Sequence, residues 1–246
     1  MNIEERIQKT VDWLKEIGES AKISGMLVGV SGGIDSAVVA HLIKRAYPEN
    51  SIGVILPIKN SEQDLEDAEE LIKSCNIRRL CIDLTEENQS LLQKVKLAMG
   101  DSYREEYNRM SDANMRARLR MTTLYTIANN LNYMVVGTDN AAEILTGYFT
   151  KYGDGGVDIL PIAHLLKSEV YEWAKVLGVP QNIINKSPSA GLWEGQTDEA
   201  ELGTSYRYID EYIKGNEIPQ KDREIIESLH KRTEHKRHTP TTPPKF

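Results

Sequence analysis

A serine- and glycine-rich loop near the N-terminus carries the side chains best suited to chemistry. Residues 29–36 read GVSGGIDS and lie where an apolar, strand-like run gives way to a helical pattern. Adjacent glycines let backbone N–H groups converge on an anion, and the following helix adds the positive end of its dipole. Ser31 and Ser36 offer hydroxyl donors, while Asp35 offers a carboxylate for a metal ion that also touches phosphates. We therefore predict a phosphate-binding loop; the alternative is a tight turn whose Ser and Asp only cap the helix.

Strands and helices that alternate along the chain must position this loop. Short apolar runs typical of buried strands occupy residues 26–30, 52–58, 79–84 and 133–136, and helical patterns occupy residues 3–17, 36–46, 64–74, 101–132, 168–177, 206–213 and 221–231. This alternation predicts βαβ units, so we expect an α/β fold with a doubly wound, mainly parallel sheet flanked by helices. Ligands bind at the carboxyl ends of such strands, which places the loops after Val30 and Val136 at the site.

The composition excludes several classes of protein. The chain has 246 residues, 40% of them hydrophobic, and a formal net charge of −7, which is typical of a water-soluble globular protein. No run reaches the ~20 apolar residues that span a bilayer, and the first residues lack the apolar core of a secretory signal. The acidic balance argues against coating of nucleic acid, and Cys75 and Cys81 cannot make a disulfide framework. We therefore expect one cytoplasmic domain over residues 1–246, with no membrane or nucleic-acid partner.

Three later segments carry further polar side chains. Residues 137–158 open with GTDNAAE, residues 185–199 read NKSPSAGLWEGQTDE, and residues 233–237 read TEHKR. Asp35 and Glu143 both follow strands that should be neighbours in the sheet, and their hard oxygen atoms suit Mg²⁺. The alternative role for Glu143 is an acid in the first turn of a helix, where it complements the helix dipole. Residues 185–204 are polar and contain glycine, which predicts a loop able to close over the site.

The loop at residues 29–36 resembles the S-G-G-x-D-S loop of the PP-loop (N-type) ATP pyrophosphatases. In order and spacing, the later segments resemble the motifs of the NAD synthetases, and the resemblance covers nearly the whole chain. It implies a Rossmann-like, adenine nucleotide alpha hydrolase-like fold. It also implies a ligase that forms a C–N bond, converting deamido-NAD, ATP and ammonia into NAD, AMP and diphosphate through an NAD-adenylate, the last step of NAD biosynthesis. Mg²⁺ as cofactor and a homodimer follow from it as well, and the helix at residues 3–17 offers an apolar stripe for the dimer interface.

The resemblance also assigns roles to particular residues. It implies that ATP is bound by Gly29, Val30, Ser31, Gly32, Gly33, Ile34, Asp35, Ser36, Thr138, Lys167 and Ser189, that deamido-NAD is bound by Arg116, Lys151, Asp158, His235 and Lys236, that the metal is held by Asp35 and Glu143, and that catalysis uses Asp154, Asp35 and Lys167. Asp154 would position or deprotonate the incoming ammonia. The alternative for Asp154 is that aspartate stands there only because it favours this turn. Arg116, Arg118 and Arg120 could instead pair with acids on a solvated helix face. Residues 230–238 could instead form a loose basic tail.

Two other functions are compatible with the phosphate-binding loop. One is another PP-loop adenylating enzyme, a tRNA-modifying ligase or a thiolase. Such enzymes need broad basic surfaces or paired reactive cysteines, and this sequence offers neither. The other is a non-catalytic nucleotide-binding regulator, which is expected to lack Asp35, Glu143, Ser31 or Ser36, yet all four are present.

The last expectation concerns the source of the nitrogen that the reaction uses. The segment before Gly29 is too short for a glutaminase domain, and neither cysteine is suitably placed to be its nucleophile. We therefore expect direct use of free ammonia; a separate glutaminase subunit is the alternative source.

Overall fold

A four-stranded parallel sheet organises the chain in this computed structural model, which describes residues 1–189 and 197–245. The strands are β1 (Gly25–Gly29), β2 (Ser51–Ile55), β3 (Arg78–Cys81) and β4 (Tyr133–Val136), in the order β3-β2-β1-β4. Every pair of neighbouring strands is parallel, so all carboxyl ends meet at one edge. The predicted parallel α/β sheet is confirmed.

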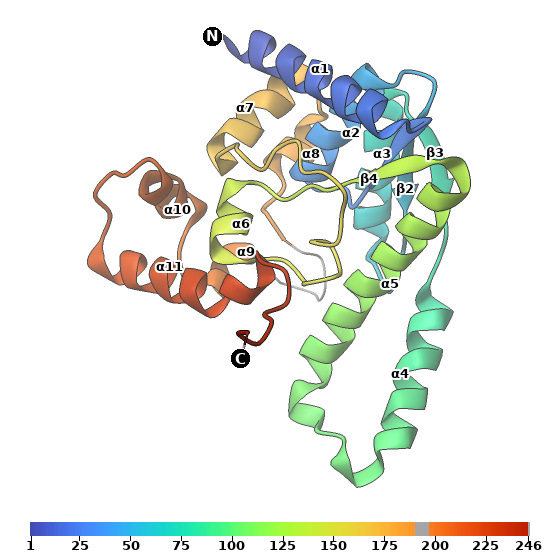
Figure 1. Cartoon of the computed structure of the whole chain (residues 1–246), viewed down its shortest axis with the longest axis vertical. Helices are drawn as coiled ribbons and strands as arrows, with labels where there is room; N and C mark the ends of the chain where they lie inside the picture. The colour runs from blue at the N-terminus through green and yellow to red at the C-terminus, as the bar shows by residue number, and fades with distance from the viewer. Residues whose placement is uncertain (190–196, 246) are drawn as a thin grey trace.

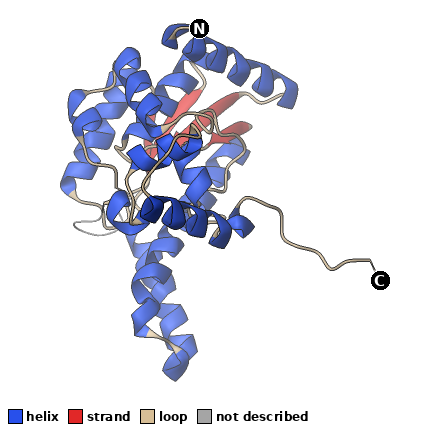
Figure 2. Cartoon of the chain, turned by 90° about the vertical axis from the view of Figure 1, so that its left-hand side faces the viewer, coloured by secondary structure: helices blue, strands red, loops and turns tan. Residues whose placement is uncertain are grey.

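Helices cover both faces of the sheet, as Figures 1 and 2 show. The helices described are α1 (Ile3–Ala21), α2 (Ile34–Ala46), α3 (Glu62–Cys75), α4 (Thr85–Met99), α5 (Asn108–Leu131), α6 (Ala141–Thr146), α7 (Lys167–Leu177), α8 (Gln181–Asn185), α9 (Asp198–Leu202), α10 (Tyr206–Ile213) and α11 (Gln220–Arg232), with short 3-10 turns at Gly100–Ser102, Glu105–Tyr107 and Glu234–Lys236. Among them we find none that combines the length and the apolar character needed to cross a bilayer.

Successive residues of β1 pack into two different hydrophobic cores. Met26 and Val28 face the core formed with α1, α2 and α7, whereas Leu27 faces the core formed with β2 and α5. This alternation follows from the two-residue period of a strand. A sheet buried on both faces needs the continuous apolar runs that the sequence shows.

Helix α1 belongs to the first of these cores. Ile7, Val11 and Leu14 are at most 2% exposed and pack within the same chain. The expectation that this apolar stripe forms a dimer interface is therefore wrong. The amphipathic pattern was real, but α2 and α7 of the same chain already cover its apolar side.

Helices α4 and α5 form a hairpin that projects from the body of the molecule (Figures 1 and 2). Our predictions placed no helix at α4 and began the α5 helix at residue 101, whereas α5 begins at Asn108. In α4 only Asn88 is buried, so the apolar periodicity that marks a core helix is weak. The residues of α4 are instead mostly good intrinsic helix formers.

Leu14→Ala tests the placement of α1 in the core. Removing this fully buried side chain leaves a cavity, so we expect the free energy of unfolding to fall by about 2–5 kcal/mol in urea denaturation. Val176→Ala, at a 39% exposed position, serves as the control and should change it by less than about 0.5 kcal/mol. Equal effects of the two substitutions would contradict the burial of α1.

Candidate active site

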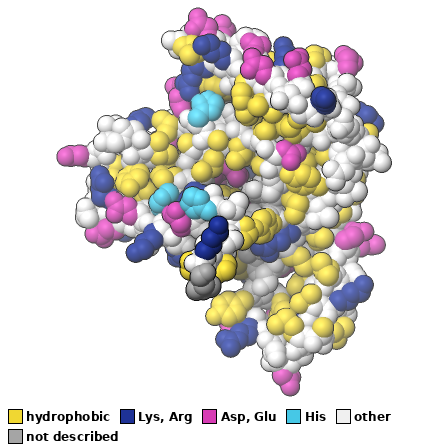
Figure 3. Space-filling model, in the orientation of Figure 1, with side chains coloured by type: hydrophobic (Ala, Val, Ile, Leu, Met, Phe, Trp, Pro, Cys, Tyr) yellow, Lys and Arg dark blue, Asp and Glu magenta, His cyan; other side chains and the backbone are white. Residues whose placement is uncertain are grey.

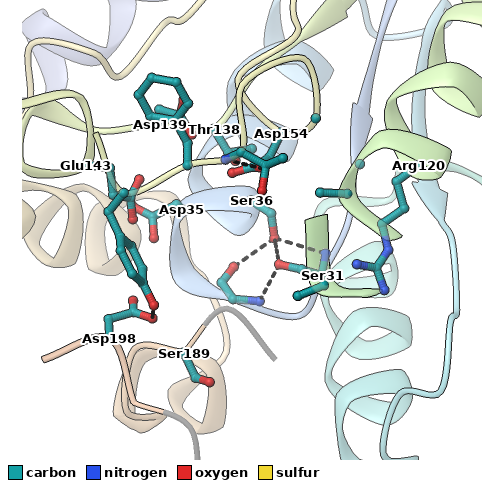
Figure 4. A pocket seen from close by; sticks show the side chains of 18 of the residues that line it. Ser31, Asp35, Ser36, Arg120, Thr138, Asp139, Glu143, Asp154, Ser189 and Asp198 are labelled. Atoms are coloured by element: carbon teal, nitrogen blue, oxygen red, sulfur yellow. Dashed lines mark hydrogen bonds between the residues drawn. The ribbon is translucent and has the colours of Figure 1, made fainter. Parts of the chain in front are cut away.

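A cavity of about 1440 Å³ opens at the carboxyl ends of the strands (Figure 4). Its walls include the glycine-rich loop after β1, the segment after β2, one side of α5, the segment after β4, the start of α7, the segment around α8 and α9, and the end of α11 with the residues that follow it. This is the edge of a parallel sheet at which ligands bind. The loops after β1 and β4 both line it, as predicted.

The glycine-rich loop is held by its own two serines. Ser36 Oγ donates to Gly33 O at 2.9 Å and lies 3.2 Å from Ser31 Oγ, which accepts from Gly33 N. Gly32 has φ +79°, and a Cβ there would lie 2.9 Å from the Cβ of Asp67. Glycine is therefore required at this turn. These hydrogen bonds fix the loop at the N-terminus of α2, and the loop lines the cavity at the position where a helix N-terminus can bind an anion.

A buried lysine joins the two carboxylates that we predicted as metal ligands. Lys167 Nζ lies 2.6 Å from Asp35 Oδ2 and 3.5 Å from Glu143 Oε1, and the Lys167 side chain is only 4% exposed. Asn140, the N-cap of α6, donates from Nδ2 to Asp35 Oδ1 at 2.9 Å. Residues from α2, α6 and α7 thus meet at one point, although they are far apart in the sequence.

Burial perturbs the proton affinities in this cluster. Desolvation, aided by the Asp35 carboxylate, raises the pKa of Glu143 to about 8. Burial by itself lowers the pKa of Lys167, but the Asp35 and Glu143 carboxylates outweigh it and raise that pKa above its usual range. The lysine ammonium is therefore fully charged, and it compensates carboxylates that would otherwise repel each other.

The carboxylates of this cluster suit an Mg²⁺ ion that is bound beside a nucleotide. No group of three or more His, Cys, Asp or Glu side chains converges on one point among the residues described. Two carboxylates beside a phosphate-binding loop are what Mg²⁺ uses when substrate phosphates and water complete its shell. Asp35 and Glu143 satisfy that description.

Lys167 is framed by groups that the sequence analysis did not single out. Its ammonium lies 4.7 Å from the centre of the Tyr206 ring, and Tyr206 Oη donates to Asp198 Oδ2 at 2.9 Å. Asp210 accepts from the backbone N–H of Lys167 and Ser168 and so caps α7. This cap offsets the unfavourable placement of a lysine at a helix N-terminus.

The residues predicted to bind deamido-NAD do not all lie together. His235 and Lys236 line the cavity, and Lys151 reaches this segment by donating from Nζ to His235 O at 2.5 Å. Asp158 accepts from Tyr125 Oη and from Val135 N, so its carboxylate ties α5 to β4. Asp158 is not among the described residues that line the cavity, and its role in binding deamido-NAD stays a prediction.

Three of the arginines of α5, at positions 116, 118 and 120, have different environments. Arg116 forms an ion pair with Asp112 one turn earlier, which is the alternative that the helical spacing allowed. Arg118 donates to Lys151 O. Arg120 lines the cavity (Figure 4). It donates to Leu56 O and Asn60 Oδ1, and burial lowers its pKa to about 10. The alternative that Arg120 pairs with an acid on a solvated helix face is wrong, because α5 turns Arg120 toward the loop after β2.

The other predicted site residues lie along the cavity wall. Thr138, Asp154 and Ser189 all line it, and Asp154 Oδ1 accepts from Thr150 N at 3.0 Å. Burial raises the pKa of Asp154. Of the predicted loop at residues 185–204, part is helical, in α8 and α9, and residues 190–196 lie outside the described residues.

Comparison with known proteins identifies the family. The family model for NAD synthase matches residues 6–240. The chain belongs to the NAD synthase family. It is 59% identical to the NH(3)-dependent NAD(+) synthetase of Alkaliphilus oremlandii, over 98% of each chain.

Two solved structures of this family of folds superpose on the chain over almost its full length. NMN synthetase from Francisella tularensis gives a TM-score of 0.92 at 42% identity and covers 99% of each chain. NH3-dependent NAD synthetase from Campylobacter jejuni gives 0.78 at 30% identity, covering 99% of this chain and 100% of that one. The NAD synthase resemblance read from the motifs is confirmed.

Lys167→Met tests the electrostatic role of the buried lysine. Without the ammonium, Asp35 and Glu143 lose their compensating charge, so we expect the free energy of unfolding to fall by about 3–5 kcal/mol. Mg²⁺ should restore part of that loss and should stabilise the wild type less. Lys186→Met is the matched control, because Lys186 also contacts two aspartates but is 30% exposed. Equal loss in both variants, or no effect of Mg²⁺, would contradict this role.

Proposed function

We propose that the chain is a ligase that amidates deamido-NAD with ammonia at the expense of ATP, giving NAD, AMP and diphosphate. The observation that carries the proposal is the convergence of the serine–glycine loop with Asp35, Glu143 and Lys167 in one cavity. The family membership and the names of the relatives support it. Another PP-loop activity and a regulator without catalysis are not favoured, because the relatives named are synthetases.

Activation of the carboxylate is the first step that the site must perform. A carboxylate resists attack because its leaving group would be oxide, so its oxygen first attacks the α-phosphate of ATP and displaces diphosphate. In our proposal the loop from Gly29 to Ser36 holds the phosphates through backbone N–H groups and hydroxyls. Thr138 and Ser189 contact ATP from the facing wall, and Lys167 offers the charge that compensates the leaving diphosphate.

Attack by ammonia is the second step. The nitrogen attacks the carbonyl carbon of the NAD-adenylate, AMP leaves with the former carboxylate oxygen, and one proton must depart from nitrogen. Asp154 is proposed to receive that proton, since burial raises its pKa and so makes it a stronger base than an exposed carboxylate. Arg116, Lys151, Asp158, His235 and Lys236 are proposed to bind the dinucleotide.

The metal cofactor is proposed to be Mg²⁺, held by Asp35 and Glu143 together with phosphate oxygens. The chemistry that Mg²⁺ supplies when bound there is neutralisation of the charge that develops on the phosphates. Both carboxylates are presented by helix N-terminal turns, whose backbone fixes their positions. In our proposal Lys167 then turns from the carboxylates toward the phosphates.

A smaller pyridine nucleotide that keeps the free carboxylate, nicotinate mononucleotide, is a second candidate substrate, and NMN would be its amide product. The Francisella tularensis structure is described as an NMN synthetase, and its TM-score of 0.92 exceeds the 0.78 of the Campylobacter jejuni NAD synthetase. NMN has the nicotinamide ribose phosphate of NAD without the adenylate half. The same site chemistry serves both, since only the nicotinate carboxylate reacts.

We also propose that residues 1–246 act as one ammonia-ligating unit, in the cytoplasm. The free thiols of Cys75 and Cys81 suit its reducing conditions. No nucleic-acid or membrane partner is proposed.

A direct assay tests the proposed reaction. Purified protein with ATP, Mg²⁺, deamido-NAD and ammonium should give NAD, AMP and diphosphate in equal amounts, and the nicotinate mononucleotide in place of deamido-NAD should react with lower kcat/KM. Asp35→Asn should reduce turnover by about 10²–10³-fold while retaining the native circular dichroism spectrum. Glutamine in place of ammonium should give no product. Release of ADP, or absence of any amide product, would refute the proposal.

The projecting hairpin is the proposed site of homodimer formation. Six apolar side chains on α4, α5 and their connection are 40–74% exposed: Leu91, Val95, Leu97, Met99, Tyr107 and Met110. Figure 3 shows apolar side chains gathered on this projecting part of the surface. Exposed apolar side chains gathered on a projecting part of a molecule are typical of an interface, and a second copy presents the same side chains.

Leu97→Asp tests this interface. Burying an unpaired carboxylate against a partner is costly, so we expect a dimer in the wild type and a monomer in the variant, measured by sedimentation velocity at equal concentration. Ile213→Asp, at a 38% exposed position on α10, is the control and should leave the dimer intact. A monomeric wild type would contradict the proposed homodimer.

A further inference from the structure

Helix α6 carries Glu143, one of the two carboxylates proposed to hold Mg²⁺, although it has only six residues. So short a helix is not stable by its own hydrogen bonds, because nucleation fixes several dihedral angles for each bond that forms. Its N-terminus is fastened by a capping box: Asn140 Oδ1 accepts from Glu143 N, and Glu143 Oε2 accepts from Asn140 N, each at 3.1 Å. The position of the Glu143 carboxylate therefore depends on the helix keeping its shape up to its other end.

The carboxyl end of α6 is covered by the C-terminal part of the chain. Helix α11 packs against α6 (Figure 1), and residues at its end and beyond it donate to the last carbonyls of α6. Arg237 Nη1 donates to Ile144 O and Leu145 O, both at 3.3 Å. His230 Nδ1 also donates to Leu145 O, at 2.8 Å, and Arg237 Nη2 donates to His230 O. One guanidinium thus joins the end of α6 to the end of α11.

Gly147, the C-cap of α6, shows how closely the two segments approach. Its φ is +65°, in the left-handed region, and a Cβ there would lie 2.3 Å from the Cβ of Thr233. Lys236 Nζ donates to Gly147 O at 2.7 Å and to Phe149 O at 2.5 Å. These contacts contradict the alternative that residues 230–238 form a loose basic tail.

The charge of Arg237 suits the end of a helix. The last carbonyls of a helix have no donor within it and carry the negative end of its dipole, so a cation there is stabilising. The Arg237 side chain is 13% exposed, which limits the screening of its charge. Its carboxylate partner Glu234 lies 3.5 Å away and is 57% exposed. Arg237 is therefore a C-terminal cap for α6, supplied from 93 residues beyond Ile144.

Glu143 depends on this cap most when nucleotide is bound. In the structure Lys167 Nζ lies 3.5 Å from Glu143 Oε1 and helps to hold it. In the proposed reaction Lys167 turns toward the phosphates, so that this contact is lost. The backbone of α6 then has to hold Glu143 beside Asp35, a like charge that repels it. A loosely capped helix would let the two carboxylates separate, which would weaken the metal site.

We propose that Arg237 is a positioning residue of the metal site, which caps the carboxyl end of α6 and thereby fixes Glu143 near the opposite end. This inference rests on the proposed function, in which Asp35 and Glu143 hold Mg²⁺. Arg237 acts through the helix and is not among the described residues that line the cavity, whereas His235 lines it. One short segment therefore serves both the dinucleotide and the metal.

Arg237→Gln tests the proposal through the binding of a metal. Mn²⁺ accepts the same oxygen ligands as Mg²⁺, and its binding is followed by the relaxation rate of water protons. With the protein saturated by an ATP analogue that has a methylene bridge between the α and β phosphorus atoms, we expect the Mn²⁺ dissociation constant to rise about 3- to 10-fold. Arg237→Lys keeps the charge and should fall between this variant and the wild type. Lys231→Gln, which removes an exposed cation of α11, is the matched control.

Steady-state kinetics separate positioning from a general loss of stability. In Arg237→Gln the Mg²⁺ concentration that gives half-maximal turnover should rise by the same factor as the Mn²⁺ dissociation constant. Turnover at saturating Mg²⁺ should stay within about twofold of the wild type, because excess metal compensates for a weaker site. Turnover that stays low at every Mg²⁺ concentration would show that Arg237 only stabilises the fold, and would overturn the inference.

The remaining results separate this inference from the proposed function. An unchanged Mn²⁺ dissociation constant in Arg237→Gln, or an equal rise in Lys231→Gln, overturns the inference and leaves the proposed reaction standing. A wild type that makes no amide product refutes the reaction, while the Mn²⁺ titration still decides the role of Arg237. Should Arg237→Gln fail to fold, His230→Phe removes one donor to Leu145 O and should raise the Mn²⁺ dissociation constant about twofold. No change in that variant would overturn the proposal.

Discussion

The buried contact between Lys167 and Asp35 is the interaction on which the rest of the site depends. Separating charges in a low-dielectric interior is unfavourable, so a lysine that is 4% exposed holds α7 against the N-terminus of α2. The same ammonium lies 3.5 Å from Glu143 Oε1 and so links α6 to α7 and α2. Asp210 of α10 caps α7 and fixes the backbone that carries the lysine. Four helices are thereby placed around the glycine-rich loop.

The acidic side chains of the cavity divide into two sets by what compensates them. Asp35 and Glu143 have the Lys167 ammonium between them, a charge that a divalent cation beside a nucleotide could replace. Asp139 and Asp154 lie farther along the wall, where Lys236 is committed to backbone carbonyls. The acidic side chains of one cavity therefore differ in environment, because the position of a lysine decides which carboxylates it contacts directly.

Local patterns predicted much of this arrangement. The apolar runs ending at Val30 and Val136 identified two adjacent strands, and β1 and β4 do pair. The glycines and serines after β1 predicted the loop correctly because turn geometry is a local property. Helix α4 and the start of α5 were not predicted well, since a projecting hairpin buries too little surface to leave a clear apolar period. The stripe of α1 was recognised, but a single chain's pattern does not say which surface covers it.

The sequence by itself determined the α/β class, the phosphate-binding loop and the carboxylates that follow two strands, because each depends on residues close together in the chain. Resemblance of the later motifs then indicated the family, which the relatives bear out. Only the tertiary structure decided that Lys167 pairs with Asp35, that Arg120 turns inward, and that Asp139 is buried beside the cavity. Such facts depend on how distant helices pack, since burial sets the strength of a charge and packing decides which charges meet.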